Sequence, residues 1–303
     1  MTTATTKQKT PYRWIQARID SLDPYKDYEE IFRLSSSYNL NDFVNNLTYG
    51  IILPTLLRPA WAARAIWRED GGKVLNKAHV RVEDTYEHNM TWMYYGPEDP
   101  RTIASINRVN DYHAKLEKVT PGCYGHNDDY VYTLCGSSRH FVSIHGEERK
   151  PLVGFPESFE GCVKFMEQHE AKPWPSDPRS ELIAESIYLQ FGYRWFPRGF
   201  HWMGRVLIVS LARPEPLKAI GVQDVHPITR IVVTWLMTWL FWLLTCAPDP
   251  APGDVLVEHK SNASTDEKKA KMRELKAWDN AFCPYFAAQT KDKWPGCPYV
   301  PFR

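Results

Sequence analysis

A run of 17 residues without a charged side chain, Ile231–Ala247, limits how this chain can fold. Only three threonines interrupt its apolar character, so it predicts a helix that protein or lipid has to cover. Such a helix would be roughly 26 Å long, slightly short of the roughly 30 Å hydrocarbon core of a bilayer. Arg230 and Asp249 lie near its ends without a strongly basic flank. We therefore expect a buried or membrane-surface helix, with a membrane span as the alternative.

Helical periodicity, broken at intervals by proline and glycine, runs through the rest of the chain, and alternating strands with hairpin turns are not found. The pattern predicts an all-α fold with a single large helical domain. Residues 1–10 are expected to be a disordered lead and residues 11–260 the domain. Residues 261–303 are expected to form a charged, exposed helix and an extended Pro/Cys-rich tail.

Two successive helices matter most for function. The first is expected over Val74–Tyr95, after a loop at Gly71-Gly72, and ends at Gly96-Pro97. The second begins at Asp99-Pro100, with proline at its first position, and runs to about Leu116. Other helices are expected over Tyr12–Leu22, Tyr25–Ser35, Asn41–Trp67 with breaks at Pro54 and Pro59, Tyr130–Phe141, Pro156–His169, Arg179–Gly192, Phe200–Ala212 and Ser261–Lys276.

The net charge of +1 gives no long-range field that would attract nucleic acid, so we expect no nucleic-acid partner. The first residues contain no apolar core of a secretory signal, and we expect the protein on the cytosolic side. The 12 Trp, 16 Tyr and 13 Phe suit either an aromatic core or a cavity for a large apolar molecule. An apolar small molecule is therefore the expected substrate.

His113 is expected on the inward face of the second helix. Ile103, Ile106 and Leu116 recur with it at spacings of three and four residues, which places the imidazole on the apolar stripe. An imidazole there is either a hydrogen-bonded core histidine or a metal ligand, because an unpaired buried polar group costs about 1–3 kcal/mol. From spacing alone, the core histidine is the favoured interpretation.

Arg81, Thr85 and His88 share one face of the preceding helix. A buried guanidinium needs an anion, which is either a neighbouring carboxylate such as Asp84 or Glu87, or the carboxylate of a cofactor or substrate. Motifs for di-iron sites, dinucleotides, nucleoside triphosphates, zinc proteases and serine hydrolases do not occur in the sequence.

Three stretches of the sequence together resemble a known family. They read Arg81-Val-Glu-Asp-Thr85, Arg108-Val-Asn-Asp-Tyr-His113-Ala and Asn127-Asp-Asp129-Tyr-Val-Tyr-Thr133-Leu, with a weaker fourth stretch at residues 213–221. Their order and spacing resemble the family that joins the fungal endoplasmic-reticulum-bound oxygenases of mycophenolic-acid type to the bacterial rubber oxygenases called latex clearing proteins. The resemblance covers residues 73–225, about half of the chain.

The resemblance implies a fold that encloses haem b, with His113 as the axial ligand of the iron and with Arg81 and Thr85 close to the haem. It implies an oxygenase that uses O₂ to cleave a carbon–carbon double bond in an apolar isoprenoid or polyketide substrate of secondary metabolism. Arg81 would balance a haem propionate or polarise bound oxygen, so Arg81 and Thr85 are also the candidate catalytic residues. A location at the endoplasmic reticulum membrane follows from the same resemblance.

The sequence departs from the family at several points. Asp84 stands where the rubber oxygenases carry a lysine, and their catalytic glutamate has no counterpart at the equivalent distance before Arg81. The N-terminal membrane anchor of the fungal members is not found in this sequence, so Ile231–Ala247 is the expected peripheral contact with a membrane.

Two alternatives to the oxygenase stay open. One is a haem-free enzyme of the same fold that works as a cyclase, isomerase or hydrolase, with Asp84 or His88 as its acid–base residue. The other is a non-catalytic, membrane-associated helical protein.

Overall fold

A computed structural model describes residues 11–38, 40–67, 72–137, 154–156, 158–175 and 177–290 of the chain. The regular secondary structure of these residues is helical, which confirms the all-α prediction. In chain order the helices are α1 (Trp14–Asp20), α2 (Tyr28–Ser37), α3 (Asp42–Thr55), α4 (Ala60–Ile66), α5 (Gly72–Asn76), α6 (Ala78–Tyr95), α7 (Pro100–Val119), α8 (Asn127–Ser137), α9 (Phe159–Ala171), α10 (Pro178–Trp195), α11 (Trp202–Leu211), α12 (Pro214–Ala219), α13 (Pro227–Thr245), α14 (Leu256–Asn262) and α15 (Thr265–Thr290). The predicted lead and the last part of the predicted tail, residues 291–303, lie outside the described residues.

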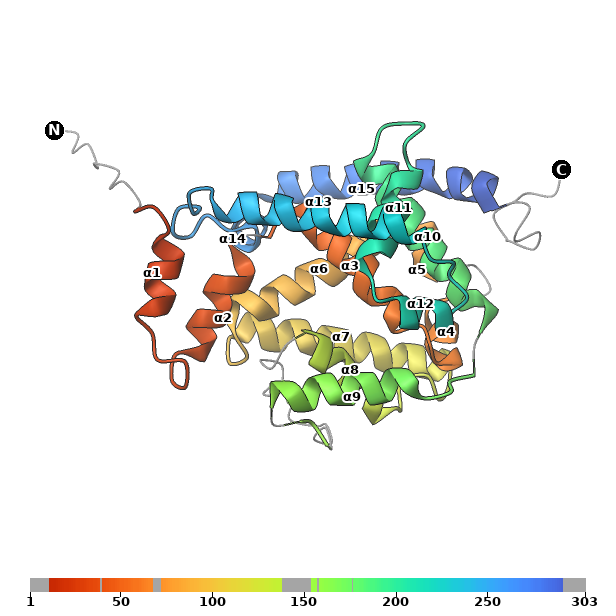
Figure 1. Cartoon of the computed structure of the whole chain (residues 1–303), viewed down its shortest axis with the longest axis horizontal. Coiled ribbons are helices and arrows are strands. Elements are labelled where there is room, and N and C mark those ends of the chain that lie inside the picture. The colour runs from red at the N-terminus through yellow and green to blue at the C-terminus, as the bar shows by residue number, and fades with distance from the viewer. Residues whose placement is uncertain are drawn as a thin grey trace.

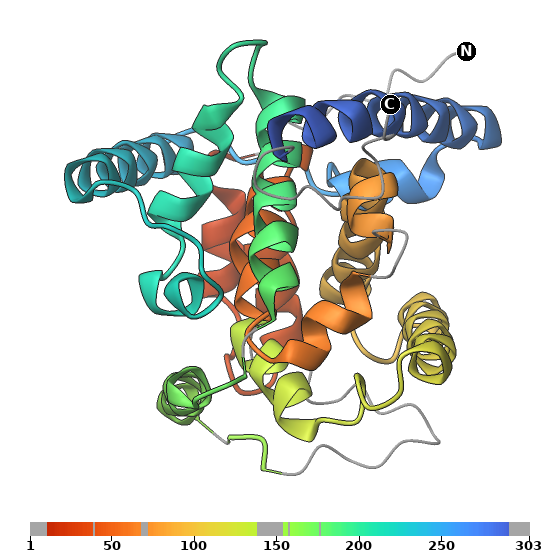
Figure 2. The ribbon, with the colours of Figure 1, turned by 90° about the vertical axis from the view of Figure 1, so that its right-hand side faces the viewer.

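Helix α10 runs through the middle of the fold (Figure 2). It packs against α3, α4 and α11, and its Ile183, Tyr188 and Phe191 side chains are fully buried. Side chains of α3, α5, α11 and α15 complete the same apolar core. Helices α13 and α15 lie along one edge of the molecule, and α7, α8 and α9 lie along the opposite edge (Figure 1).

Two helices begin with the same Asp-Pro pair. The Asp99 carboxylate accepts a hydrogen bond from the backbone N–H of Arg101 at 2.8 Å, and Pro100 is the first residue of α7. Asp177 and Pro178 begin α10 in the same way. A carboxylate cap satisfies a free N–H of the first turn, and proline has no N–H to satisfy there. The predicted start of the second functional helix is therefore confirmed, and its end lies three residues beyond Leu116.

The single helix predicted over Val74–Tyr95 is wrong at one point, because Lys77 divides it into α5 and α6. Lys77 has a non-helical backbone, with φ −144° and ψ 47°. The carboxylate of Asp279, on α15, accepts the backbone N–H of His79 at 2.7 Å and so caps the first turn of α6. A cap from a distant part of the chain leaves no signal in the local sequence.

The two prolines predicted to break Asn41–Trp67 behave differently. Pro54 lies inside the last turn of α3, whereas Pro59 lies directly before α4. The prediction was therefore right for Pro59 and wrong for Pro54. A proline in the last turn removes only one backbone hydrogen bond, so the helix reaches Thr55.

The charged segment predicted over Ser261–Lys276 is exposed along nearly all of its length, as expected, but the tail predicted to be extended after it is helical as far as Thr290. The residues of the charged segment belong to α14 and to α15, and α15 continues through Pro284 to Thr290. Phe282 and Phe286 of α15 are fully buried in the same core as α10. The prediction overlooked the apolar stripe because charged residues fill the first half of α15.

Candidate functional site

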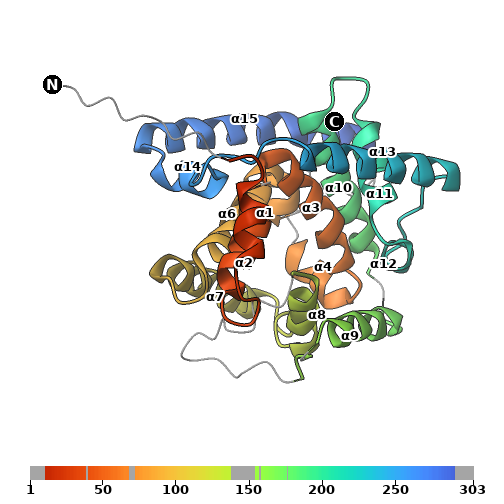
Figure 3. The ribbon, with the colours of Figure 1, turned by 60° about the vertical axis from the view of Figure 1, so that its left-hand side comes forward.

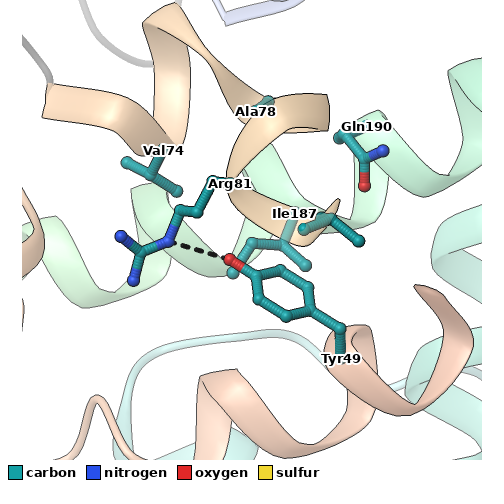
Figure 4. A pocket seen from close by; sticks show the side chains of 7 residues that line it. Tyr49, Val74, Ala78, Arg81, Ile187 and Gln190 are labelled. Carbon is teal, nitrogen blue, oxygen red and sulfur yellow. Dashed lines mark hydrogen bonds between the residues drawn. The ribbon is translucent and has the colours of Figure 1, made fainter. Parts of the chain in front are cut away.

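A small hollow beside Arg81 is the best candidate for a functional site. Tyr49 of α3, Val74 of α5 and Ile187 of α10 line it, together with Ala78, Val82 and Gln190, and its empty volume is about 170 Å³. Figure 4 shows the Arg81 side chain reaching from α6 across the mouth of this hollow to Tyr49. Apart from Arg81, Gln190 and the Tyr49 hydroxyl, the lining is apolar.

Arg81 is held by a neutral partner. Its Nε donates a hydrogen bond to the Tyr49 hydroxyl at 2.9 Å, while its two Nη atoms point away from that ring (Figure 4). Burial raises the pKa of Tyr49, and the nearby guanidinium opposes this rise, so the phenol is neutral at neutral pH. Within the described residues, no carboxylate lies within 4.0 Å of Arg81.

The two carboxylates considered as partners of Arg81 do not pair with it. Asp84 lies 3.3 Å from the Lys73 ammonium, and Glu87 is exposed on α6. A partly buried guanidinium without a carboxylate is a site that an anionic group of a ligand can complete, because Arg presents a planar pair of donors. This favours the cofactor or substrate carboxylate among the sequence-based interpretations.

His113 lies on α7 at the level of the turn that carries Arg81. Thr102 contacts the Thr91 carbonyl at 3.4 Å, and three residues further on Ser105 contacts His88 at 2.7 Å. The two helices are therefore antiparallel here: a contact three residues later in α7 is made with a residue three positions earlier in α6. Tyr112, the residue before His113, lies within electrostatic range of Arg81, so this part of α7 is near the Arg81 turn.

The His113 imidazole stacks on the ring of Tyr124, with ring centroids 4.6 Å apart and planes at 27°. Burial raises the pKa of Tyr124 to about 12, and the positive charge of Arg81 partly opposes this rise. Tyr124 thus lies within electrostatic range of Arg81 and in contact with His113. Its aromatic ring links the two predicted site residues.

The expected inward orientation of His113 is only partly right. His113 is partly buried, and Ile103 of the same stripe is 47% exposed while Ile106 is buried. The reason is that α7 lies at the edge of the molecule and packs mainly against α6 (Figure 1). Thr85 lies one turn after Arg81 and is also partly buried.

His88 is fixed between α6 and α7. Its Nδ1 contacts the Ser105 hydroxyl at 2.7 Å, and the same hydroxyl accepts a hydrogen bond from Trp92 Nε1 at 2.8 Å. Since Trp92 donates, the Ser105 hydroxyl proton is free to donate to His88 Nδ1, which leaves the proton of the neutral imidazole on Nε2. Burial lowers the pKa of His88, so it can act as a neutral base.

The side-chain types at this site suit haem, whereas the size of the hollow does not. The His113 imidazole and the Arg81 guanidinium are the side-chain types that would hold an iron and a propionate. The space in the hollow, however, is too narrow to admit a water molecule, whereas ordinary ligand pockets measure roughly 300–1,000 Å³. Haem held by His113 would therefore have to displace the Tyr124 ring, which stacks on that imidazole.

Sequence reasoning missed a buried network around Arg58, whose side chain is 1% exposed. Its Nη2 donates to His169 Nδ1 at 2.9 Å, so the imidazole proton lies on Nε2, which faces the Asp129 carboxylate at 3.4 Å. The sequence signal was available only for Asp129, which belongs to one of the resembling stretches. The network ties α8 and α9 to the end of α3.

A second missed pair joins α6 to α15. His79 is fully buried, and its Nδ1 lies 3.0 Å from the Asp279 carboxylate. The rings of Trp278 and Phe282 each lie 5.6 Å from the imidazole, and its Nε2 has no hydrogen-bond partner in the described structure. Burial lowers the pKa of His79, although Asp279 opposes the change, so the imidazole is neutral.

Comparison with models of protein families finds none that matches this chain, and comparison with curated proteins finds no significant match. The resemblance to the oxygenase family therefore depends on the sequence stretches quoted above.

Proposed function

We propose that the protein is an oxygenase that acts on an apolar isoprenoid or polyketide substrate, with haem b as the group that activates dioxygen. The observation that carries this proposal is Arg81, a partly buried guanidinium that has no carboxylate partner among the described residues and lies within electrostatic range of Tyr124, the ring on which His113 stacks. An anionic propionate would supply the charge that Arg81 lacks.

In this proposal the protein positions groups and excludes water. His113 would hold the haem iron through a ring nitrogen, and Arg81 would bind a propionate through its Nη atoms. When bound, haem supplies the oxygen chemistry. Val74, Val82 and Ile187 would present an apolar wall to the substrate, and Thr85 would offer its hydroxyl one turn away from Arg81.

The experiment is an absorbance titration of the purified full chain with hemin. We expect a Soret band, and we expect His113→Ala to weaken hemin binding by about tenfold or more, equivalent to about 1.4 kcal/mol. His126→Ala is the matched control, because His126 lies in the same connection between α7 and α8 as Tyr124 but stacks on Trp61. Equal hemin binding by both variants would contradict the role of His113.

Tyr124 provides a second test. If haem displaces the Tyr124 ring from His113, Tyr124→Ala should strengthen hemin binding, because the ring no longer has to move. Arg81→Leu should weaken hemin binding. A folded, colourless protein that gives a flat titration with hemin in all variants would overturn the proposal.

A haem-free enzyme acting on a similar substrate is the second candidate. The small volume of the hollow favours it, as does the neutral, fixed imidazole of His88. Its acid–base residue would be His88, whereas Asp84 is engaged by Lys73. The same titration separates the two candidates, since this one predicts no hemin binding and activity that persists without O₂.

A further inference from the structure

Helix α13 leaves most of its apolar surface uncovered. Its first half packs on the body through Val233 and Met237, and Met237 is 9% exposed. From residue 238 to the end of the helix at Thr245 every residue is exposed. The apolar side chains that are at least 40% exposed are Ile228, Ile231, Val232, Trp235, Leu236, Trp239, Leu240, Phe241, Trp242, Leu243 and Leu244.

Such exposure excludes the interpretation of α13 as an internal core helix. The helix is long and apolar enough to cross a membrane, yet only 6% of its most apolar window is buried in the protein. Three tryptophans, Trp235, Trp239 and Trp242, are each about half exposed. Tryptophan is enriched where proteins meet the boundary between lipid and water.

The first end of α13 is tied to the folded body. Arg230 donates hydrogen bonds to the carbonyls of Ser210 and Ala212 at 2.9 and 2.7 Å, and it also pairs with Asp224 at 2.5 Å. These carbonyls lie at the end of α11, against which α13 packs.

The second end of α13 is tied to the same body by the residues before α1. The Tyr12 hydroxyl donates to the carbonyl of Cys246 at 2.8 Å, and Arg13 donates to the carbonyl of Thr245 at 3.1 Å. A 19-residue helix is about 28 Å long. A span would place these two ends on opposite sides of a bilayer, although both are bonded to one folded body.

We propose that α13 binds a lipid bilayer by lying in the plane of its surface, with the aromatic and aliphatic side chains of residues 235–244 inserted among the acyl chains. The helix projects beside the body, so its outer side can reach a membrane (Figures 2 and 3). Phe200, Trp202 and Met203, at the start of α11, are also 52%, 58% and 38% exposed.

Lipid fits α13 better than a second protein does. Among the described residues, every position from 238 to 245 is exposed, so apolar side chains point outward on several sides of the helix, and a protein partner resting on one side would leave the others in water. No charged side chain lies between Arg230 and Asp249, so nothing in this stretch opposes insertion among acyl chains. The inference is independent of haem, because it rests on α13 alone.

Flotation of the full chain with neutral phosphatidylcholine vesicles tests the contact. We expect the protein to float at both low salt and about 0.5 M salt, because apolar insertion is not screened. The triple variant Trp235→Ser, Trp239→Ser, Trp242→Ser should bind vesicles about tenfold or more weakly, since less apolar area is inserted. Tyr25→Ser with Tyr28→Ser is the matched control, because both tyrosines are exposed far from α13 in the sequence.

Labelling with a membrane-impermeant maleimide tests the orientation. Cys246 is exposed at one end of α13, and Ile228→Cys places a thiol at the other end. The protein is added to sealed vesicles, and an in-plane helix leaves both thiols reactive with the reagent outside. The labelling of Cys246 is the amount lost in the variant Cys246→Ser. A spanning helix leaves one thiol protected until detergent is added, and this result would overturn the in-plane orientation.

Two further outcomes would overturn the proposal. One is unchanged flotation of the folded triple variant, which would mean that another surface binds lipid. The other is a wild-type chain that does not bind vesicles but forms a stable dimer in sedimentation, together with a triple variant that no longer forms this dimer. That result would assign α13 to contact between copies of the chain.

Discussion

Arg58 and Arg81 show two ways of keeping a guanidinium in apolar surroundings. Arg58 donates to the carbonyls of Thr55 and His169 and to an imidazole nitrogen, and it lies over the ring of Tyr132. Neutral acceptors thus surround it, and burial lowers its pKa. Within the described part of the chain, Arg81 donates from Nε to Tyr49 and its Nη atoms have no acceptor, so a ligand can bind them. At the residue scale, Arg58 is therefore structural and Arg81 is the candidate for binding.

His79 predicts a pH dependence of stability. Its pKa is lowered in the folded state by burial, so the folded protein favours the neutral imidazole. The unfolded chain takes up the proton near its ordinary pKa of about 6.5. The stability contributed by neutral His79 is therefore complete above that pH and is lost as the pH falls toward the lower folded-state pKa.

Thermal unfolding between pH 7.5 and 5.5 checks this prediction. The wild-type Tm should fall with pH, and His79→Asn should have a lower Tm at pH 7.5 but a smaller dependence on pH. Exposed His259 on α14 supplies the control variant His259→Asn. A pH dependence in His79→Asn as steep as in the wild type would count against the buried neutral imidazole.

Helices α10 and α11 cross at two glycines. A Cβ atom on Gly204 would lie 2.4 Å from Gly192 Cα, and one on Gly192 would lie 2.1 Å from the His201 carbonyl oxygen. Both contacts are with backbone, which cannot rotate away. The crossing sets the position of α11 and, through α11, the position of α13.

Replacement of Gly204 by alanine should destabilise the protein by about 1–3 kcal/mol, because an added methyl group forces two packed helices apart. Urea unfolding followed by circular dichroism measures the change. Gly125→Ala is the control, since a Cβ there meets nothing within 4 Å. A loss below about 0.5 kcal/mol would show that the crossing tolerates a wider separation.

Helix boundaries could be predicted where adjacent residues set them, and could not be predicted where residues distant in the sequence set them. The start of α7 follows from Asp99 and Pro100, two adjacent residues. The break at Lys77 depends on Asp279, and the position of α8 and α9 depends on Arg58 and His169, so neither could be read locally. The length of α13 was close to the prediction, whereas its exposure depends on what the rest of the chain leaves uncovered.

The candidate site was predicted in part for the same reason. Helical spacing placed Arg81 and Thr85 on one face, and Tyr112 and Tyr124, which adjoin His113 in the sequence and in space, lie within electrostatic range of Arg81. Tyr49 could not be predicted as the partner of Arg81, because it lies on α3 and has no recognisable motif. Tyr124 was missed because it lies in the connection between α7 and α8.

At the scale of the whole molecule, α15 belongs to the main core. Phe282 is fully buried and lies in one apolar cluster with residues of α3, α5 and α10. Phe282→Ala should therefore cost about 3–5 kcal/mol and lower the stability of the whole protein rather than release α15 alone.

Urea unfolding followed by both circular dichroism and tryptophan fluorescence checks this expectation, since the two signals should shift together. Met272→Ala, on the exposed side of the same helix, should change stability by less than about 1 kcal/mol. Separate transitions for the two signals would indicate that α15 unfolds independently.

The bond between Asp279 and His79 also has a consequence for synthesis. The two residues are 200 positions apart, so the ribosome makes the cap of α6 about 10–40 seconds after it makes the first turn of that helix. During this interval α6 and the site it carries lack the carboxylate that fixes their first turn. The emerging chain therefore exposes the Arg81 region in an unfinished form, and a chaperone or a cofactor has access to it before α15 arrives.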